Sequence, residues 1–471
     1  MTRILLAGGR IIDPASGRDE VADLLIAGGR VAAIGHPGTA GPADRTLDCR
    51  GRLIVPGLID LHVHLREPPL GNAASNVGRD EIPACRLASG TGTPGFHPGL
   101  HASARPAAQP PQEGPAETIA SGAAAAAAGG FTAVCAMPNT QPPVDSAAAV
   151  AYYIEQGRKA GRAHVLPVGC QTAGRAGRKP ADLAALRAAG AVAFSDDGAD
   201  VADPAVFESV LRLAARLGAP VFCHCEDAAL ADGGVINDGP LATALGLPGI
   251  APEAEEAAVQ RACDAAARTG CRVHICHVST AGAVAIIRRA KAAGAPVTAE
   301  ASPHHLTLTE ESLAGRDTVF KVNPPLRSGH DVDAVLEGVR DGAIDCLATD
   351  HAPHSAESKR RPLAEAPAGM IGLESALPVY IKALVDPGLL AWPQLVARLT
   401  TNPARVLGLE MGRLDVGAAA DVTVIDPEVP WRIEPEKFAS RARNCPFAGW
   451  EVRGRAVATI VGGRVVFERK D

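Results

Sequence analysis

The middle of the chain alternates short apolar runs with longer segments of helical periodicity. The apolar runs are rich in Val, Ile, Phe and Cys, and Ala- and Leu-rich segments with helical spacing separate most of them. Parallel strands need crossover connections, which helices supply, so this alternation predicts an α/β fold, a (β/α)8 TIM-like barrel. An open doubly wound sheet is the alternative, but no GxGxxG turn follows any run. Strands are expected at 58–64, 132–137, 164–169, 191–195, 220–224, 272–277, 297–301 and 346–349, and helices at 181–189, 204–217, 254–269 and 281–293.

The two ends of the chain follow a different pattern. Short apolar runs there are separated by turn signals such as Gly8-Gly9, Asp13-Pro14 and Gly462-Gly463, which is typical of antiparallel strands joined by hairpins. We therefore expect a small β-sandwich domain built from residues 1–56 and 410–471. Residues 57–409 are expected to form the barrel.

One segment, residues 69–116, fits neither pattern. It is dense in Pro, Gly, Ala and Ser and has no sustained periodicity. Such long loops are usually functional or disordered, so we predict a flexible insertion, with an active-site lid as the second interpretation. His97 and His101 lie inside it, and we expect both to be solvent-exposed rather than metal ligands.

Composition narrows the class of protein. The 471 residues suit a barrel with a second unit, and the net charge of -6 without basic clusters argues against nucleic acid or an anionic membrane as the main partner. The longest uncharged run, 118–144, is broken by Gly129-Gly130 and is not expected to span a membrane. Its six alanines after Gly122 predict a closely packed barrel helix. The 11 Cys include no CxxC pair, which favours a reducing, cytoplasmic location.

The first barrel strand carries the strongest chemical signal. Alternate side chains of a strand share a face, so His62 and His64 should point together into the barrel mouth, spaced to hold one metal ion. Arg66 follows just beyond the strand, where a guanidinium can hold a carboxylate with two hydrogen bonds. Taken alone, the two histidines could equally be ordinary core or surface residues.

Later strand ends carry further ligand types. The pair Asp196-Asp197 closes one apolar run, and His224, His277 and Asp350 close three others; the carboxyl ends of barrel strands are where catalytic residues converge. Singly, each is more often a packed histidine or a capping aspartate. Together they indicate two adjacent sites of nitrogen and oxygen ligands, which suits Zn²⁺, with Mn²⁺ or Co²⁺ as alternatives. Two such ions would activate water and polarise a carbonyl.

At this point the motifs resemble those of dihydroorotases, specifically the bacterial type I enzymes of the amidohydrolase superfamily. The resemblance covers nearly the whole chain except the insertion. It rests on DLHVHLREP at 60–68, MPNT at 137–140, FSDDG at 194–198, HCED at 224–227, CHVST at 276–280, SPHHL at 302–306, KVNPPLR at 321–327, TDHAPH at 349–354 and NCPF at 444–447.

The resemblance implies an activity and a role for each matched residue. The activity is reversible hydrolysis of the cyclic amide of (S)-dihydroorotate to N-carbamoyl-L-aspartate in pyrimidine biosynthesis, with two Zn²⁺ per subunit. His62 and His64 would bind one ion, His224 and His277 the other, and Asp197 would bridge them. Asp350 would contact the first ion and carry the proton. The implied substrate-binding positions are His64, Arg66, Asn139, Asn323, His354, Ala368 and Gly369.

Two other functions stay open. Another cyclic-amide hydrolase, of the hydantoinase or allantoinase type, would not need residues that bind a carboxylate, and many such enzymes bridge their metals through a lysine that the 191–197 segment lacks. A catalytically inactive scaffold for aspartate transcarbamoylase should have lost metal ligands, yet all six positions are intact. A homodimer and association with aspartate transcarbamoylase are the partner predictions.

The remaining polar residues near these motifs are ambiguous. His304 and His305 could support the ligands or form a buried, backbone-bonded pair, and His351 is expected to be structural because it alternates away from Asp350. Lys321 and Arg327 could be surface charges or supports at the base of a loop.

Overall fold

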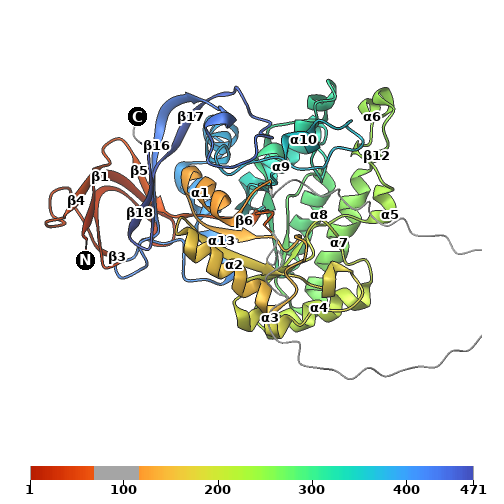
Figure 1. Ribbon diagram of the computed structural model, residues 1–471, viewed down its shortest axis with the longest axis horizontal. Coiled ribbons are helices and arrows are strands. Elements are labelled where there is room, and N and C mark those ends of the chain that lie inside the picture. The colour runs from red at the N-terminus through yellow and green to blue at the C-terminus, as the bar shows by residue number, and fades with distance from the viewer. Residues whose placement is uncertain (1, 68–115, 470–471) are drawn as a thin grey trace, which may run out of the picture.

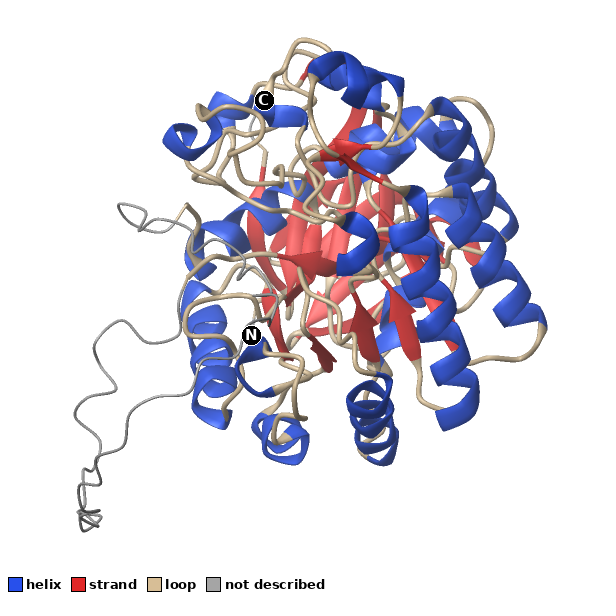
Figure 2. Ribbon diagram, turned by 90° about the vertical axis from the view of Figure 1, so that its right-hand side faces the viewer, coloured by secondary structure: helices blue, strands red, loops and turns tan. Residues whose placement is uncertain are grey.

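Eight short parallel strands form the central sheet of the computed structural model, which describes residues 2–67 and 116–469. Helices surround the strands on the outside (Figure 2). A parallel bridge between Val63 and His351, with a 2.8 Å hydrogen bond from the His64 amide to the His351 carbonyl, joins the last strand back to the first. The predicted barrel is therefore confirmed. Its strands are β6 (Leu58–Val63), β7 (Phe131–Ala136), β8 (His164–Gly169), β9 (Ala193–Ser195), β10 (Val221–Cys223), β13 (Val273–Ile275), β14 (Val297–Ala301) and β15 (Cys346–Leu347).

The helices between the strands begin where side chains cap them. Asp203 accepts hydrogen bonds from the first amides of α4, and Thr280 and Ser328 do the same for α8 and α9. All four predicted helices are present, with ends shifted by one or two residues. The helices are α2 (Ala147–Ala160), α3 (Leu183–Ala189), α4 (Pro204–Arg216), α5 (Ala228–Ala231), α6 (Pro240–Leu245), α7 (Pro252–Thr269), α8 (Ala281–Ala292), α9 (Gly329–Asp341), α10 (Ala356–Lys359), α11 (Ala376–Tyr380), α12 (Trp392–Leu399) and α13 (Thr401–Leu407).

The alanine run forms α1 (Ile119–Gly129), which packs between the barrel and the second sheet. Two of its glycines have no room for a side chain. A Cβ at Gly122 would lie 2.4 Å from Leu65 Cδ2, and one at Gly129 would lie 2.0 Å from the Leu373 carbonyl oxygen. On its other side, the Thr459 hydroxyl donates to the Ala127 carbonyl. Small residues are required because the helix is enclosed by two layers.

The second sheet joins the two ends of the chain, which lie side by side as red and blue strands in Figure 1. Its central pairing is between β5, just before the barrel, and β16, which follows it; Val55 is in register with Thr423. The predicted composite β domain is thus confirmed. Its strands are β1 (Ile4–Asp13), β2 (Arg18–Ala27), β3 (Arg30–Gly35), β4 (Arg45–Asp48), β5 (Leu53–Pro56), β16 (Val422–Arg432), β17 (Glu451–Val461) and β18 (Arg464–Glu468); β11 (Ile236–Asn237) and β12 (Gly249–Ile250) form a separate pair.

Some predictions are not tested by this fold. The insertion at 69–116, apart from Ala116, lies outside the described residues, and so do His97 and His101. The boundaries of the two domains stay predictions. Among the described residues, no helix combines the length and the apolar character needed to cross a membrane.

Candidate metal centre

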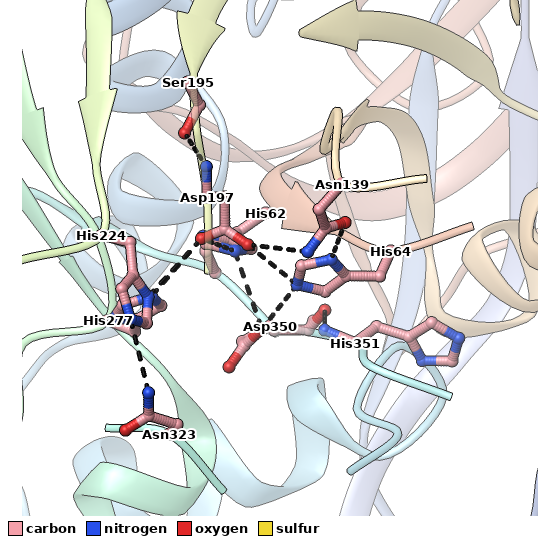
Figure 3. Close-up of polar contacts among 12 residues, drawn as sticks. His62, His64, Asn139, Ser195, Asp197, His224, His277, Asn323, Asp350 and His351 are labelled. Atoms are coloured by element: carbon pink, nitrogen blue, oxygen red, sulfur yellow. Dashed lines mark hydrogen bonds and ion pairs between the residues drawn. The ribbon is translucent and has the colours of Figure 1, made fainter. Parts of the chain in front are cut away.

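Six side chains from five strand ends meet at one mouth of the barrel (Figure 3). His62 lies on β6, His64 directly follows that strand, and the others stand one to three residues beyond the ends of β9, β10, β13 and β15. All are buried, with exposed fractions of 5% or less. Because parallel strands place their carboxyl ends at one edge, residues far apart in sequence converge there. The six are His62, His64, Asp197, His224, His277 and Asp350.

Asp197 lies at the centre of this cluster. Its Oδ1 is 3.2 Å from His62 Nε2, and its Oδ2 is 3.6 Å from His64 Nε2. Asp350 closes the same side, with Oδ1 3.2 Å from His64 Nε2 and 3.7 Å from His62 Nε2. Two imidazoles and two carboxylates therefore face one small volume.

A second group shares the same carboxylate. Asp197 Oδ1 is 3.8 Å from His224 Nδ1 and 3.7 Å from His277 Nε2, and these two nitrogens are 3.0 Å apart. Asp197 is thus common to two groups of three buried ligand types, His62–His64–Asp197 and Asp197–His224–His277.

The spacing of these atoms fits metal ions. Zn–N and Zn–O bonds of about 2.0–2.2 Å in a tetrahedron place ligand atoms about 3.3 Å apart. The separations in both groups, 3.0 to 3.8 Å, bracket that value. His62 Nε2 and Asp197 Oδ1 are also buried without a hydrogen-bond partner among the described residues. Buried polar atoms normally have a partner, so a ligand for these two is expected. The residues present therefore fit a pair of metal ions.

The electrostatics of the cluster favour a cation. Burial by itself would lower the pKa of His62, but the Asp197 carboxylate outweighs it and raises that pKa well above its ordinary value. Burial would raise the pKa of Asp197, yet the charge of His62 and the contact with His277 hold it well below its usual range. Asp197 and His62 therefore favour a positive charge between them, which a proton or a metal ion can supply.

Asp350 is held in its ionised form. Burial opposes ionisation, but the contact with His64 and the charge of His62 keep the pKa of Asp350 far below its usual range. His304 lies behind it, with Nε2 4.0 Å from Asp350 Oδ2, and burial lowers the pKa of His304 to about 4. The carboxylate therefore has the protonation state that a proton acceptor needs.

Asn139 contacts two of the six clustered side chains. Its Oδ1 is 2.9 Å from His64 Nδ1, so that nitrogen donates and His64 Nε2 is left with a lone pair facing Asp197 and Asp350. Its Nδ2 donates to Asp197 Oδ2 over 3.2 Å. Asn139 was expected to bind substrate, and its amide still has one further N–H for that role. Its contact with the ligands is an addition that the sequence did not indicate.

The other expected substrate-binding residues make contacts close to the cluster. His354 Nε2 is 2.8 Å from the Ala368 carbonyl, so it donates there, and the 3.4 Å contact with Arg66 is not a hydrogen bond. Arg66 Nε donates to the Pro353 carbonyl, which leaves its terminal nitrogens available for an anion. Asn323 Nδ2 lies 3.5 Å from His224 Nε2. Gly369, with φ +130°, adopts a conformation that favours glycine.

Asn444, in the NCPF segment, holds the loop that carries His354, Ala368 and Gly369. Its Nδ2 donates to the Ala352 and Gly369 carbonyls, and its Oδ1 accepts from the His354 amide. In the sequence, this segment was recognised only as one of the matched motifs, and no role for Asn444 was predicted.

Three site residues have left-handed backbone conformations, which are costly for residues other than glycine. They are Arg66 (φ 53°), His277 (φ 34°) and Asp350 (φ 48°). Such conformations cost about 1–3 kcal/mol each and cluster at functional sites. They turn the chain sharply just after a strand and aim these side chains inward.

The ambiguous residues are now placed. His305 is buried and bonded to the Pro324 carbonyl, and His351 contacts Glu117 and accepts from the Gly372 amide, so both are structural. The surface interpretation of Lys321 and Arg327 is wrong, because their exposed fractions are 8% and 2%. Their donors reach loop carbonyls and the Asn237 side chain instead.

Comparison with known proteins agrees with this geometry. The model of the amidohydrolase family matches residues 53–466. A dihydroorotase from Pelotomaculum thermopropionicum is 46% identical over 467 residues, 99% of each chain, and one from Pelobacter propionicus is 43% identical over 466 residues, 99% of this chain and 100% of that one. Among solved structures, an L-hydantoinase (dihydropyrimidinase) from Arthrobacter aurescens has a TM-score of 0.79 at 26% identity and covers 100% of this chain and 97% of that one. The chain therefore belongs to the amidohydrolase family and, within it, to the dihydroorotases.

Proposed function

We propose that this chain is an enzyme that reversibly hydrolyses the cyclic amide of (S)-dihydroorotate to N-carbamoyl-L-aspartate. The observation that carries the proposal is the carboxylate of Asp197, which is shared between two pairs of buried histidines (Figure 3). The relatives that match nearly the whole chain are named dihydroorotases, which supports the same substrate.

Two Zn²⁺ ions are the proposed cofactors, one held by His62, His64 and Asp350, the other by His224 and His277, with Asp197 shared. When bound, they would supply an activated water and polarise the amide carbonyl. The donor set of imidazole nitrogens and carboxylate oxygens also suits Mn²⁺ or Co²⁺.

The chain's own residues supply binding and proton transfer. Arg66 would hold the substrate carboxylate, and Asn139, Asn323, His354 and the backbone of Ala368 and Gly369 would orient the ring. Asp350, ionised and facing the cluster, would accept the proton released as water adds to the carbonyl carbon, and would return it to the ring nitrogen as the C–N bond breaks. Arg66 stays charged and therefore takes no part in proton transfer.

A substrate comparison tests the proposal. The purified chain, loaded with Zn²⁺, is assayed with dihydroorotate, dihydrouracil and allantoin, and its metal content is measured. We expect turnover of dihydroorotate and two ions per chain. Preference for dihydrouracil or allantoin would favour the hydantoinase or allantoinase type. A chain that binds no metal and turns over none of these substrates would favour a scaffold for aspartate transcarbamoylase.

Three further parts of the proposal are separate from the chemistry. We place the enzyme in the cytoplasm, where the free cysteines of the described residues would stay reduced. We also propose a homodimer and association with aspartate transcarbamoylase. Light scattering of the isolated chain and of its mixture with that enzyme tests both.

A further inference from the structure

A buried hydrogen-bonded chain runs from the metal centre into the barrel interior. Glu300 on β14 is fully buried, with Oε1 2.9 Å from His62 Nδ1 and Oε2 3.0 Å from His274 Nε2. His274 on β13 is equally buried, and its Nδ1 is 2.8 Å from Thr298 Oγ1. None of these three residues belongs to the proposed ligand set or to the substrate-binding positions.

The geometry fixes the tautomer of His62. An ionised carboxylate only accepts hydrogen bonds, so the nitrogen 2.9 Å from it must carry the proton. A neutral His62 then has its lone pair on Nε2, the atom that faces Asp197 and has no hydrogen-bond partner in the part of the chain that the structure describes. With the opposite tautomer, a lone pair would face the carboxylate and an N–H would occupy the metal position.

His274 fixes the carboxylate in turn. Its Nε2 donates to Glu300 and its Nδ1 accepts from the Thr298 hydroxyl, so both ring nitrogens are used and the ring cannot turn without losing both bonds. The Glu300 carboxylate is thereby held between two imidazoles. Partners of this kind orient metal ligands and raise their basicity.

A competing interpretation concerns Cys276. Its thiol forms, with His62 and Glu300, a third group of buried ligand types that could itself hold an ion. An ion there would have to displace the proton that His62 donates to Glu300. It would also have to compete with the hydrogen bonds that both Glu300 oxygens already accept. The hydrogen-bonded arrangement is therefore the favoured one, and the number of ions bound decides between them.

We propose that Glu300, itself oriented by His274, is a positioning residue that presents His62 Nε2 to the metal. The inference rests on the proposed metal binding. It predicts that Glu300 acts on metal affinity without being a ligand, and that His274 acts only through Glu300.

The test measures Zn²⁺ affinity by competition with a chelator in the full chain. Glu300→Gln replaces one acceptor oxygen by a donor and should weaken binding about 10–100-fold, with the number of ions at saturation unchanged. His274→Phe should weaken it by a smaller factor, and the double variant should be no worse than Glu300→Gln alone. Glu117→Gln is the matched control, since Glu117 is a buried carboxylate facing His351, which is not a ligand.

Each outcome is decisive. Affinity of a folded Glu300→Gln variant within threefold of the parent chain overturns the inference, and so does loss of one ion with unchanged affinity for the others, which would make Glu300 a ligand. If circular dichroism of the metal-free chain shows that Glu300→Gln does not fold, the His274→Phe variant decides. Weaker Zn²⁺ binding by His274→Phe then supports the inference, and unchanged binding overturns it. Failure of the parent chain to bind Zn²⁺ overturns the proposed function as well. Normal binding and turnover with an inert Glu300 overturn only this inference.

Discussion

Replacing Asp350 by Asn separates proton transfer from metal binding. The two side chains have the same shape, but the amide cannot accept a proton at neutral pH. Asp350 Oδ1 is 3.2 Å from His64 Nε2 and 3.7 Å from His62 Nε2, so the substitution changes charge and basicity at the centre of the cluster. The four histidines and Asp197 remain.

The size of the effect follows from the role of the lost group. General acid–base catalysis contributes about 10²–10⁴-fold, or about 2.7–5.4 kcal/mol of activation free energy. We therefore expect kcat to fall by about that factor in both reaction directions. KM should change less than tenfold, because the proposed substrate-binding residues Arg66 and His354 are untouched.

The assay measures kcat and KM with dihydroorotate and with N-carbamoyl-L-aspartate, alongside the metal content of the same sample. Asp196→Asn is the matched control. Asp196 is as buried as Asp350, but it accepts hydrogen bonds from the Gln171 and Thr172 amides rather than facing the histidines. It should keep its metal and retain kcat within severalfold.

Two results would refute this reasoning. One is an Asp350→Asn variant with full metal and more than a tenth of the parent kcat, because Asp350 would then not be the proton acceptor. The other is a loss of activity that merely follows a loss of metal, which would make Asp350 a ligand without a separate role in proton transfer.

Three further predictions follow from the same structure. Arg66→Met removes the proposed carboxylate clamp, and charged hydrogen bonds worth about 1.5–3 kcal/mol correspond to a rise of about 10–150-fold in KM for dihydroorotate; an unchanged KM would contradict the assignment. Metal affinity should fall with decreasing pH, beginning above pH 6.5, because the proton competes for His62 Nε2 and the pKa of His62 is raised; chelator competition between pH 6 and 9 measures this, and a flat profile would count against it. Gly129→Ala would place a Cβ 2.0 Å from the Leu373 carbonyl oxygen and should lower the free energy of unfolding by about 1–3 kcal/mol in urea titration, more than Ala128→Gly at the neighbouring position.

The sequence by itself was enough to predict the barrel, the second β unit and the types of side chain that meet at the carboxyl ends of the barrel strands. The strand runs at 164–169 and 297–301 match β8 and β14 residue for residue, because their short length and the helical segments on either side favour buried strands. Others, such as 272–277 against Val273–Ile275, were too long at their carboxyl ends. There the chain leaves the strand early, and His277 turns inward with a left-handed backbone.

The tertiary structure alone decided how the site is held. Strand alternation placed His62 and His64 on one face, but which ring nitrogen of each faces the centre depends on Asn139 and on Glu300, which is 238 residues away from His62. A glutamate inside the apolar run 297–301 was the available signal, because a buried carboxylate needs partners. Hydrogen-bond partners that are distant in sequence leave no periodicity along the chain, so only the closed barrel could show that Glu300 and His274 lie next to the proposed metal ligand His62.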